Sequence, residues 1–407
     1  MKRPTLTIFY QFNPWDSSIG GIQTFIRSFI KYAPDEFKVR LVGTGDGSSL
    51  LGVWQRVKLD NKSIEFLPLI NLKNDNVRGL IPTTVKYTAA LLGRNYASDF
   101  MHFHRLEPTM ATLNWSGDKT LFVHNDIKAQ INPEKGNDAM LWTRFAAVYS
   151  ALETRLIRQF DRIYSCNSES AKYYQQNYPN LAKQVTLMKN IVDTDLFFPL
   201  PSQKREHQRQ ILARKLNLNE QTHFVLFVGR LHPQKDPILL IRAFAELSES
   251  NTHLLIAGDG ELAEAVSSEI CAHNLSERVT LLGALKQEQL VNLYRSASVF
   301  FLSSLYEGLP IAVLEALACG TPIVTTDCGE TPNLLTANSG VVAQERTPKA
   351  LAAALSQVLQ NPTAFPASAC VSVAQPYTAK ALVGNLYQQM LLLWEEKNLA
   401  FPVTKVV

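Results

Sequence analysis

The chain has 407 residues, enough for two domains, and its 46% hydrophobic and 19% charged residues are typical of a globular protein with sizeable cores. No apolar run approaches the ~18–20 residues that span a bilayer, and no opening segment has the features of a secretory signal. Residues 1–195 carry 24 Lys+Arg against 18 Asp+Glu, and residues 196–407 carry 16 against 18. Without a dense basic run or an aromatic-basic motif, we expect no nucleic-acid partner.

The cysteines indicate the compartment. There are five, an odd number at scattered positions without a CxxC pair, which is typical of a reducing environment. We therefore expect a cytoplasmic protein. The basic first half is compatible with peripheral contact to an anionic membrane or with an anionic acceptor, although an ordinary mixed surface explains the same charge.

In the first half, short β-rich runs alternate with amphipathic helical patterns. We predict helices at 22–31 and 142–160, and strands at 5–10, 38–42, 100–103, 120–124, 162–166 and 185–188. The second half repeats the scheme more regularly. There we predict helices near 237–247, 261–273, 287–297 and 311–319, and strands at 223–228, 253–257, 279–282, 299–302 and 323–325.

This alternation indicates an α/β fold of parallel sheets covered by helices on both faces. The segment 199–210 is polar, contains proline and has no hydrophobic period, so we predict the domain break there. The expected domains are residues 1–199 and 200–377, followed by a long helical pattern at 379–399 within residues 378–407. Ligands of such sheets bind beyond the carboxyl ends of the strands, so the expected site lies between the domains.

Glycines and histidines mark strand ends in the first half. Gly20 and Gly21 open the first helix, where backbone amides can approach a phosphate or sugar, although a lone Gly-Gly is more often a tight turn. His104 with Arg105 follows one later predicted strand, and His124 is the last residue of the next. A histidine at a strand end is more often structural than ligand-binding, and a zinc site lacks a local set of further ligands.

Two charged clusters mark the second half. Arg230 and Lys235 leave the carboxyl edge of its first strand, a placement that suits two phosphate charges. Glu307 and Glu315 stand eight positions apart in an apolar run, with Glu307 expected in the loop before a helix that begins near Pro310 and Glu315 about a turn and a half inside it. This spacing suits two parts of one polyhydroxylated ligand. The alternative is an acidic helix cap plus one solvated glutamate.

The run from Glu307 to Glu315 resembles the Glu, seven residues, Glu signature of retaining nucleotide-sugar glycosyltransferases of the GT-B architecture, specifically glycosyltransferase family four (glycosyl transferases group one). The match continues on both sides, through the Gly-Arg and Lys of 229–235. It covers most of residues 5–335, is most specific in 224–330, and is loose in the first domain. The resemblance implies two Rossmann-like domains facing a cleft, with the helix of residues 378–407 crossing back to the first.

The resemblance also implies the chemistry. The donor is a nucleoside-diphosphate sugar, the acceptor a hydroxyl, such as that of a lipid-linked or growing surface glycan, and no metal or other cofactor is expected. Arg230 and Lys235 would hold the diphosphate, Glu307 and His124 would lie at the donor sugar, and Glu315 would bind the ribose. The remaining implied contacts are to the donor from Gly20, Gly21, Gly229, Leu285, Gly308 and Leu309, and on the acceptor side from His104 and Arg105.

Three features limit the resemblance. Asp193-Thr194-Asp195 imitates the DxD metal motif of another glycosyltransferase architecture, but its position resembles a connection whose aspartates cap turns. Glu330 follows Gly329 where the family has a second glycine, which leaves that donor contact open. A GT-B-like sugar-nucleotide epimerase and a non-catalytic sugar-nucleotide-binding protein remain as alternatives, whereas a phosphorylase should show a pyridoxal lysine site that is not found.

Overall fold

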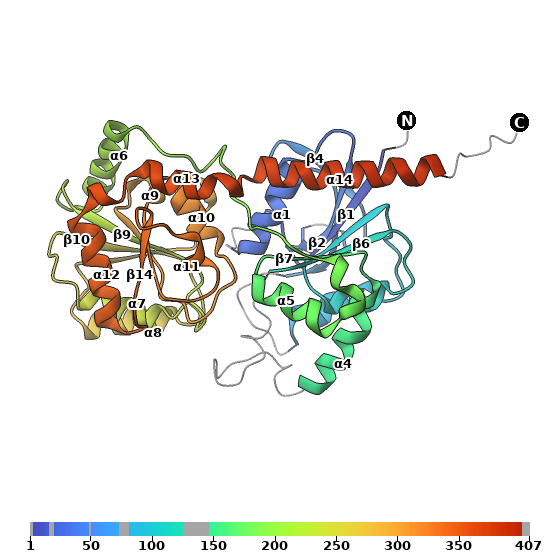
Figure 1. Ribbon diagram of the computed structural model, residues 1–407, viewed down its shortest axis with the longest axis horizontal. Helices are drawn as coiled ribbons and strands as arrows, with labels where there is room; N and C mark the ends of the chain where they lie inside the picture. Colours follow the sequence, from blue (N-terminus) through green and yellow to red (C-terminus); the bar gives the residue numbers. More distant parts are fainter. Residues whose placement is uncertain (1–2, 16–19, 49, 73–80, 125–145, 401–407) are drawn as a thin grey trace, which may run out of the picture.

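The computed structural model describes residues 3–15, 20–48, 50–72, 81–124 and 146–400. These residues form two lobes, each a β-sheet with helices packed on it (Figure 1). This α/β architecture confirms the predicted fold class. Within the described part of the chain, no helix is both long and apolar enough to cross a membrane.

The first lobe contains an eight-stranded sheet in the order β3-β4-β2-β1-β5-β6-β7-β8. Its strands are β1 (Thr5–Phe9), β2 (Lys38–Gly45), β3 (Gln55–Leu59), β4 (Lys62–Asn71), β5 (Phe100–Phe103), β6 (Asp118–Val123), β7 (Arg162–Ser165) and β8 (Val185–Leu187). The α-helices are α1 (Gly21–Lys31), α2 (Thr83–Leu91), α4 (Ala146–Leu156) and α5 (Ser168–Asn177). The start of the helix expected at 142–160 lies outside the described residues.

One pair of strands departs from the expected parallel pattern. β3 and β4 pair antiparallel and form a hairpin that the sequence did not indicate. Its tight turn is made by Asp60 and Asn61, which adopt φ values of 48° and 65°. Asp and Asn tolerate this left-handed conformation better than most residues and favour two-residue hairpin turns. The hairpin lies at the sheet edge, where polar residues such as Lys58 replace the apolar run of a central strand.

The second lobe contains a six-stranded, entirely parallel sheet in the order β11-β10-β9-β12-β13-β14. Its strands are β9 (His223–Val228), β10 (Thr252–Ala257), β11 (Val279–Gly283), β12 (Val299–Phe301), β13 (Ile323–Thr325) and β14 (Gly340–Val342). Its α-helices are α7 (Pro237–Ala245), α8 (Ala263–Ala272), α9 (Gln287–Ser296), α10 (Ile311–Ala318), α11 (Thr331–Leu334), α12 (Pro348–Gln360) and α13 (Ala367–Ala374).

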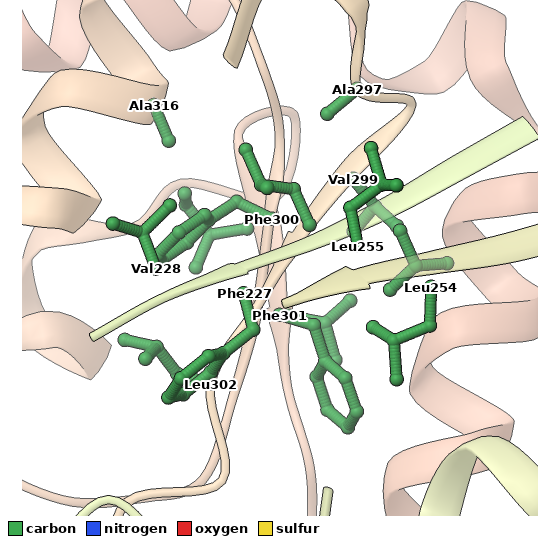
Figure 2. Packing of buried hydrophobic residues seen from close by; sticks show 14 of the residues in the cluster. Phe227, Val228, Leu254, Leu255, Ala297, Val299, Phe300, Phe301, Leu302 and Ala316 are labelled. Carbon is green, nitrogen blue, oxygen red and sulfur yellow. The ribbon is translucent and has the colours of Figure 1, made fainter. Parts of the chain in front are cut away.

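The central strands of this sheet are buried on both faces. Figure 2 shows Phe227, Leu255 and Phe300 among the side chains that pack around them, and all three are fully buried. Full burial explains why these strands appear in the sequence as continuous apolar runs rather than alternating ones. The sheet therefore provides a firm base for the loops at its carboxyl edge.

The segment between the lobes contains a helix that the sequence did not indicate. Residues 199–210, where the domain break was predicted, overlap helix α6, which spans Ser202–Lys215. In its first half, the half-buried Arg205 guanidinium donates hydrogen bonds to the carbonyls of Arg295, Ala297 and Gly320 at 2.7–3.0 Å, and near its end Ala213 is buried in the core. Because an arginine attaches the first half, hydrophobic periodicity does not detect the helix there.

The last helix, α14 (Ala379–Ala400), runs along the first lobe (Figure 1). The Tyr387 hydroxyl donates to the Phe29 carbonyl of α1 at 3.0 Å, and Val383 lies in the core with α1 and β1. The chain therefore enters the second lobe at α6 and returns to the first at α14. This double connection brings the carboxyl edges of the two sheets into contact.

Candidate functional site

The loops at the carboxyl edges of the two sheets meet at Gly308. A Cβ added to Gly308 would lie 3.2 Å from both the His124 carbonyl oxygen and the Cys166 sulfur of the first lobe. On the next residue, the Leu309 carbonyl accepts a hydrogen bond from the Asn190 side-chain amide. These distances are shorter than ordinary van der Waals contact, so a side chain at 308 would require its neighbours to shift by a few tenths of an ångström, and Gly308 allows the close approach of the lobes.

The start of α1 lies at the same junction. Gly20 is the N-cap of α1 in extended conformation, and Gly21 begins the helix with its Cα facing Ile311, the first residue of α10. The α1 and α10 helices thus approach each other at their N-termini, where free backbone amides point outward. Ser18 and Ile19, which precede this pair in the expected glycine loop, lie outside the described residues.

The basic pair lies in the loop between β9 and α7. Arg230 is exposed, and among the described residues its guanidinium has no ion-pair or hydrogen-bond partner. The Lys235 ammonium forms an ion pair with Glu307. The loop is fixed to the glutamate segment through the Gln234 side chain, which donates to the Tyr306 carbonyl at 3.1 Å. Gly229, which precedes Arg230, packs closely against Gly258. A Cβ on Gly258 would lie 1.8 Å from the Gly229 carbonyl oxygen, so only glycine fits at position 258.

Glu307 is a buried carboxylate with two partners. Its side chain is only 6% exposed, and the Oε1 atom accepts from the Ser304 hydroxyl at 2.7 Å as well as from Lys235. A buried charge needs such pairing, and the predicted partner of the donor sugar is here in direct contact with a predicted phosphate ligand. An ammonium has three donors, so Lys235 retains donors for a phosphate while bound to Glu307.

Glu315 lies one turn into α10 and is also buried, with 5% exposure. Its Oε2 atom accepts from the Tyr294 hydroxyl of α9 at 2.8 Å. Burial raises the pKa of this carboxyl to about 7, with a smaller contribution from the nearby negative charge of Asp193. The alternative interpretation of Glu315 as a solvated helix glutamate is therefore wrong.

The histidines of the first lobe form a pair. The His104 Nδ1 and His124 Nε2 atoms are 2.8 Å apart, and the two ring planes are inclined by only 20°, with centroids 5.1 Å apart. Burial lowers the pKa of both imidazoles, to about 3 for His124, where the charge of the adjacent Arg105 lowers it further. Both rings are consequently neutral at physiological pH. Asn125 and Asp126, which follow His124, lie outside the described residues.

The aspartates of the DxD-like run are engaged elsewhere. Asp193 forms an ion pair with Lys31 at 2.5 Å, and the Tyr32 hydroxyl donates to both Asp193 and Asp195. The backbone amide of Asp195 also donates to the Asp193 side chain at 3.2 Å, as in a capped turn. Among the described residues, no group of three or more His, Cys, Asp or Glu side chains is arranged to hold a metal ion.

Three partners in the site were not anticipated. Tyr294 and Ser304 donate to the two glutamates, and Glu330 accepts from the backbone amide of Ser168 at 2.8 Å, in the first turn of α5. Glu330 thus places a negative charge at a helix N-terminus of the opposite lobe, a favourable interaction with the helix dipole. That Glu330 stands where the resembled family has a glycine was visible in the sequence. Its contact with Ser168 could not be predicted, because it depends on how the two lobes meet.

Leu285 occupies the loop after β11. It is half-buried, two residues beyond Gly283, whose φ of 66° turns the chain at the strand end. This conformation favours glycine. Gln287, at the start of α9, donates to the Thr24 hydroxyl of α1 at 3.3 Å, so this loop also faces the first lobe. Residues implied at the donor from both lobes therefore border one junction.

Residues 208–370 match the family of glycosyl transferases group 1. The resemblance drawn from the glutamate signature is thereby confirmed over this segment. The chain is 31% identical over 166 residues to the uncharacterized glycosyltransferase MJ1059 of Methanocaldococcus jannaschii, a match that covers 40% of this chain and 39% of that protein.

Solved structures extend the likeness to the whole fold. A sucrose-phosphate synthase from Thermosynechococcus elongatus superposes with a TM-score of 0.78 at 18% identity, over 96% of this chain and 100% of that one. Anabaena HepE in complex with UDP-glucose gives a TM-score of 0.71 at 17% identity, over 97% of this chain and 100% of that one. The expected two-domain GT-B fold is thereby confirmed.

Proposed function

We propose that this protein is a retaining glycosyltransferase that moves a hexose-type sugar from a nucleoside diphosphate to a hydroxyl acceptor. The observation that carries the proposal is the junction at Gly308, where Lys235 and Glu307 of the second lobe lie beside a loop packed against the His124 carbonyl. This arrangement suits a ligand with an anionic diphosphate and a hydroxyl-rich sugar. Arg230 and Lys235 supply positive charge for the phosphates, and carboxylates accept sugar hydroxyl protons.

The proposed reaction needs charge stabilisation at the leaving group. As the bond between the sugar and the diphosphate breaks, negative charge grows on the phosphate, and Arg230 and Lys235 stabilise that charge. The acceptor hydroxyl attacks from the face that the phosphate leaves, and the phosphate takes the hydroxyl proton. Glu307 and Glu315 are assigned to sugar and ribose hydroxyls, so neither serves as the nucleophile of a double displacement.

The first test is donor binding followed by transfer. UDP-glucose is the first probe because HepE was solved with it, and other nucleotide sugars follow. A bound donor should raise the melting temperature by mass action, and an acceptor should then cause release of nucleoside diphosphate. Binding without turnover in any acceptor mixture would favour the non-catalytic alternative. Interconversion of two sugar nucleotides would favour the epimerase alternative. The absence of both donor binding and turnover would contradict the proposal.

Retention of configuration is the stereochemical prediction. An α-linked donor should give an α-linked product without a trapped glycosyl-enzyme, because no carboxylate is assigned to the opposite face. Proton NMR of the anomeric signal during turnover measures this directly. A β-linked first product from an α-linked donor would contradict the assignment.

We also propose that transfer does not require a divalent metal. Arg230 and Lys235 provide the charge that a metal supplies in DxD enzymes, and Asp193 and Asp195 are already bonded to Lys31 and Tyr32. Chelator should leave the rate within about twofold. An enzyme that chelator inactivates and manganese restores would overturn this part of the proposal.

The acceptor is proposed to be lipid-linked, with peripheral membrane contact through the first lobe. The loop before β3 exposes Leu50 and Leu51, and the Arg94 guanidinium lies against the same loop at Gly52, next to exposed Leu92. Exposed apolar residues beside basic ones suit an anionic bilayer. Sedimentation with vesicles containing phosphatidylglycerol should exceed that with neutral vesicles, and Leu50→Ser with Leu51→Ser should abolish the difference. Equal recovery from both vesicle types would contradict the contact.

A further inference from the structure

The histidine pair of the first lobe is enclosed by aromatic rings. His104 stacks on Phe122 with an interplanar angle of 13°, and Phe25 packs edge-on against both His104 and His124. His104 follows β5 and is buried, with 5% exposure, whereas His124 follows the adjacent strand β6 and is half-buried. The pair therefore has a buried member and a member that reaches the junction, with its backbone carbonyl at Gly308.

The hydrogen bond between the two rings determines which atom of His124 is left for a ligand. A neutral imidazole carries one N–H and one unprotonated nitrogen, and the bond uses His124 Nε2 in either direction. If His104 Nδ1 donates, the proton of His124 lies on Nδ1. If His124 Nε2 donates, its Nδ1 is an acceptor. In both cases, Nδ1 is the ring nitrogen that can meet the donor sugar, and the bond direction decides whether it donates or accepts.

We propose that His104 is a positioning residue that fixes the ring plane and the tautomer of His124. It acts through the 2.8 Å bond between the rings, and stacking on Phe122 keeps the His104 ring in place. This inference rests on the proposed function in one respect, namely that His124 contacts the donor sugar. A fixed tautomer presents one defined donor or acceptor to a sugar oxygen, and removal of such a supporting partner misaligns a catalytic group.

Two substitutions separate the bond from the space that the ring fills. His104→Phe keeps an aromatic ring for stacking but removes both nitrogens. His104→Asn places an amide near the position of Nδ1 and can keep the bond. We expect His104→Phe to lower kcat by about 5–10-fold with little change in the KM for donor, as for the loss of one buried hydrogen bond. His104→Asn should remain within about threefold of the wild type.

A double-mutant cycle tests whether the effect passes through His124. In a His124→Phe background, His104→Phe should cost no further activity, because the residue through which it acts is gone. Additive losses would show an independent role for His104. Equal losses in His104→Asn and His104→Phe would show that the bond is not what matters. Either result overturns the inference.

Nitrogen-15 NMR of labelled histidine gives a readout that does not need turnover. In the wild type, the two His124 nitrogens should show one protonated and one unprotonated signal, and in His104→Phe both should move toward averaged positions as two tautomers mix. His124→Phe assigns the signals, and melting temperature checks that each variant folds. A single unchanged tautomer in His104→Phe would overturn the inference. If the wild type transferred no sugar, the proposed function would fail while the tautomer result still stood.

Discussion

Replacing Arg230 by alanine is expected to lower kcat by about 10²–10³-fold, the range seen when one preorganised charge-stabilising donor is lost. Arg230 is exposed and, among the described residues, has no side-chain partner, so its removal should leave the melting temperature unchanged. The charge on the leaving phosphate grows only as the glycosidic bond breaks. Affinity for the free nucleoside diphosphate should therefore fall much less than turnover.

Arg214→Ala is the matched control. Arg214 is another exposed arginine of the same chain, paired with Glu220 at the end of α6, and its removal changes net charge by the same amount. It should leave kcat unaltered, since surface pairs contribute little. Arg230→Lys should recover part of the lost rate, because it restores the charge without the bidentate geometry. Full turnover by Arg230→Ala would contradict the assignment of Arg230 to the diphosphate.

Lys235 is a less direct probe of the same charge. Its ammonium pairs with Glu307, which is 6% exposed, so Lys235→Ala would leave a buried carboxylate with the Ser304 hydroxyl as its remaining partner among the described residues. Breaking a buried pair by removing one member is strongly destabilising. Loss of activity in that variant would mix catalysis with stability, whereas Arg230→Ala would not.

The parallel sheets were predictable because their strands are buried on both faces. β9 (His223–Val228) lies at its predicted positions. After His223 all of its residues are apolar and buried, so the strand is visible in the sequence as an uninterrupted apolar run. A parallel strand also fixes which end carries the site, so the loop with Arg230 could be placed from sequence alone. The same logic placed His124 after β6, although the strand ends one residue earlier than expected.

The contacts that the sequence did not show are long-range and polar. Lys235 and Glu307 are 72 positions apart, and Tyr294 reaches Glu315 from the neighbouring helix α9. Each pairing depends on how helices pack on the sheet, and no local pattern encodes it. Helix α6 was missed for a related reason, because its polar first half is attached to the domain by the long-range hydrogen bonds of Arg205.

Nucleotide affinity is expected to depend on pH through Glu315. Burial raises the pKa of its carboxyl to about 7, so the unliganded protein carries a mostly protonated group at pH 6 and a mostly ionised one at pH 8. A carboxylate accepts two hydroxyl protons from a ribose cis-diol, whereas a protonated carboxyl does so poorly. Affinity for a nucleoside diphosphate should therefore rise by about tenfold from pH 6 to pH 8.

Glu315→Gln isolates this contribution. The amide oxygen can still accept from Tyr294, but the group does not titrate, so affinity should be lower at pH 8 by about 10-fold or more and follow only the phosphate's own ionisation. Titration calorimetry of both proteins at each pH separates the two effects. An equal pH dependence in the wild type and the variant would contradict the placement of Glu315 at the ribose.

The same carboxyl should make stability fall as pH rises. Its pKa is higher in the folded chain than the ordinary value of 4.5, so the folded state holds a proton that the unfolded state has released. The favourable contribution is complete below about pH 4.5 and is lost as pH rises through about 7, which amounts to ~3 kcal/mol. In denaturant unfolding, the free energy of unfolding of Glu315→Gln relative to that of the wild type should therefore rise by ~3 kcal/mol between pH 4.5 and pH 8. A stability difference that does not change with pH would mean that folding does not raise the pKa of Glu315, and the pH dependence of nucleotide affinity would have to come from another group.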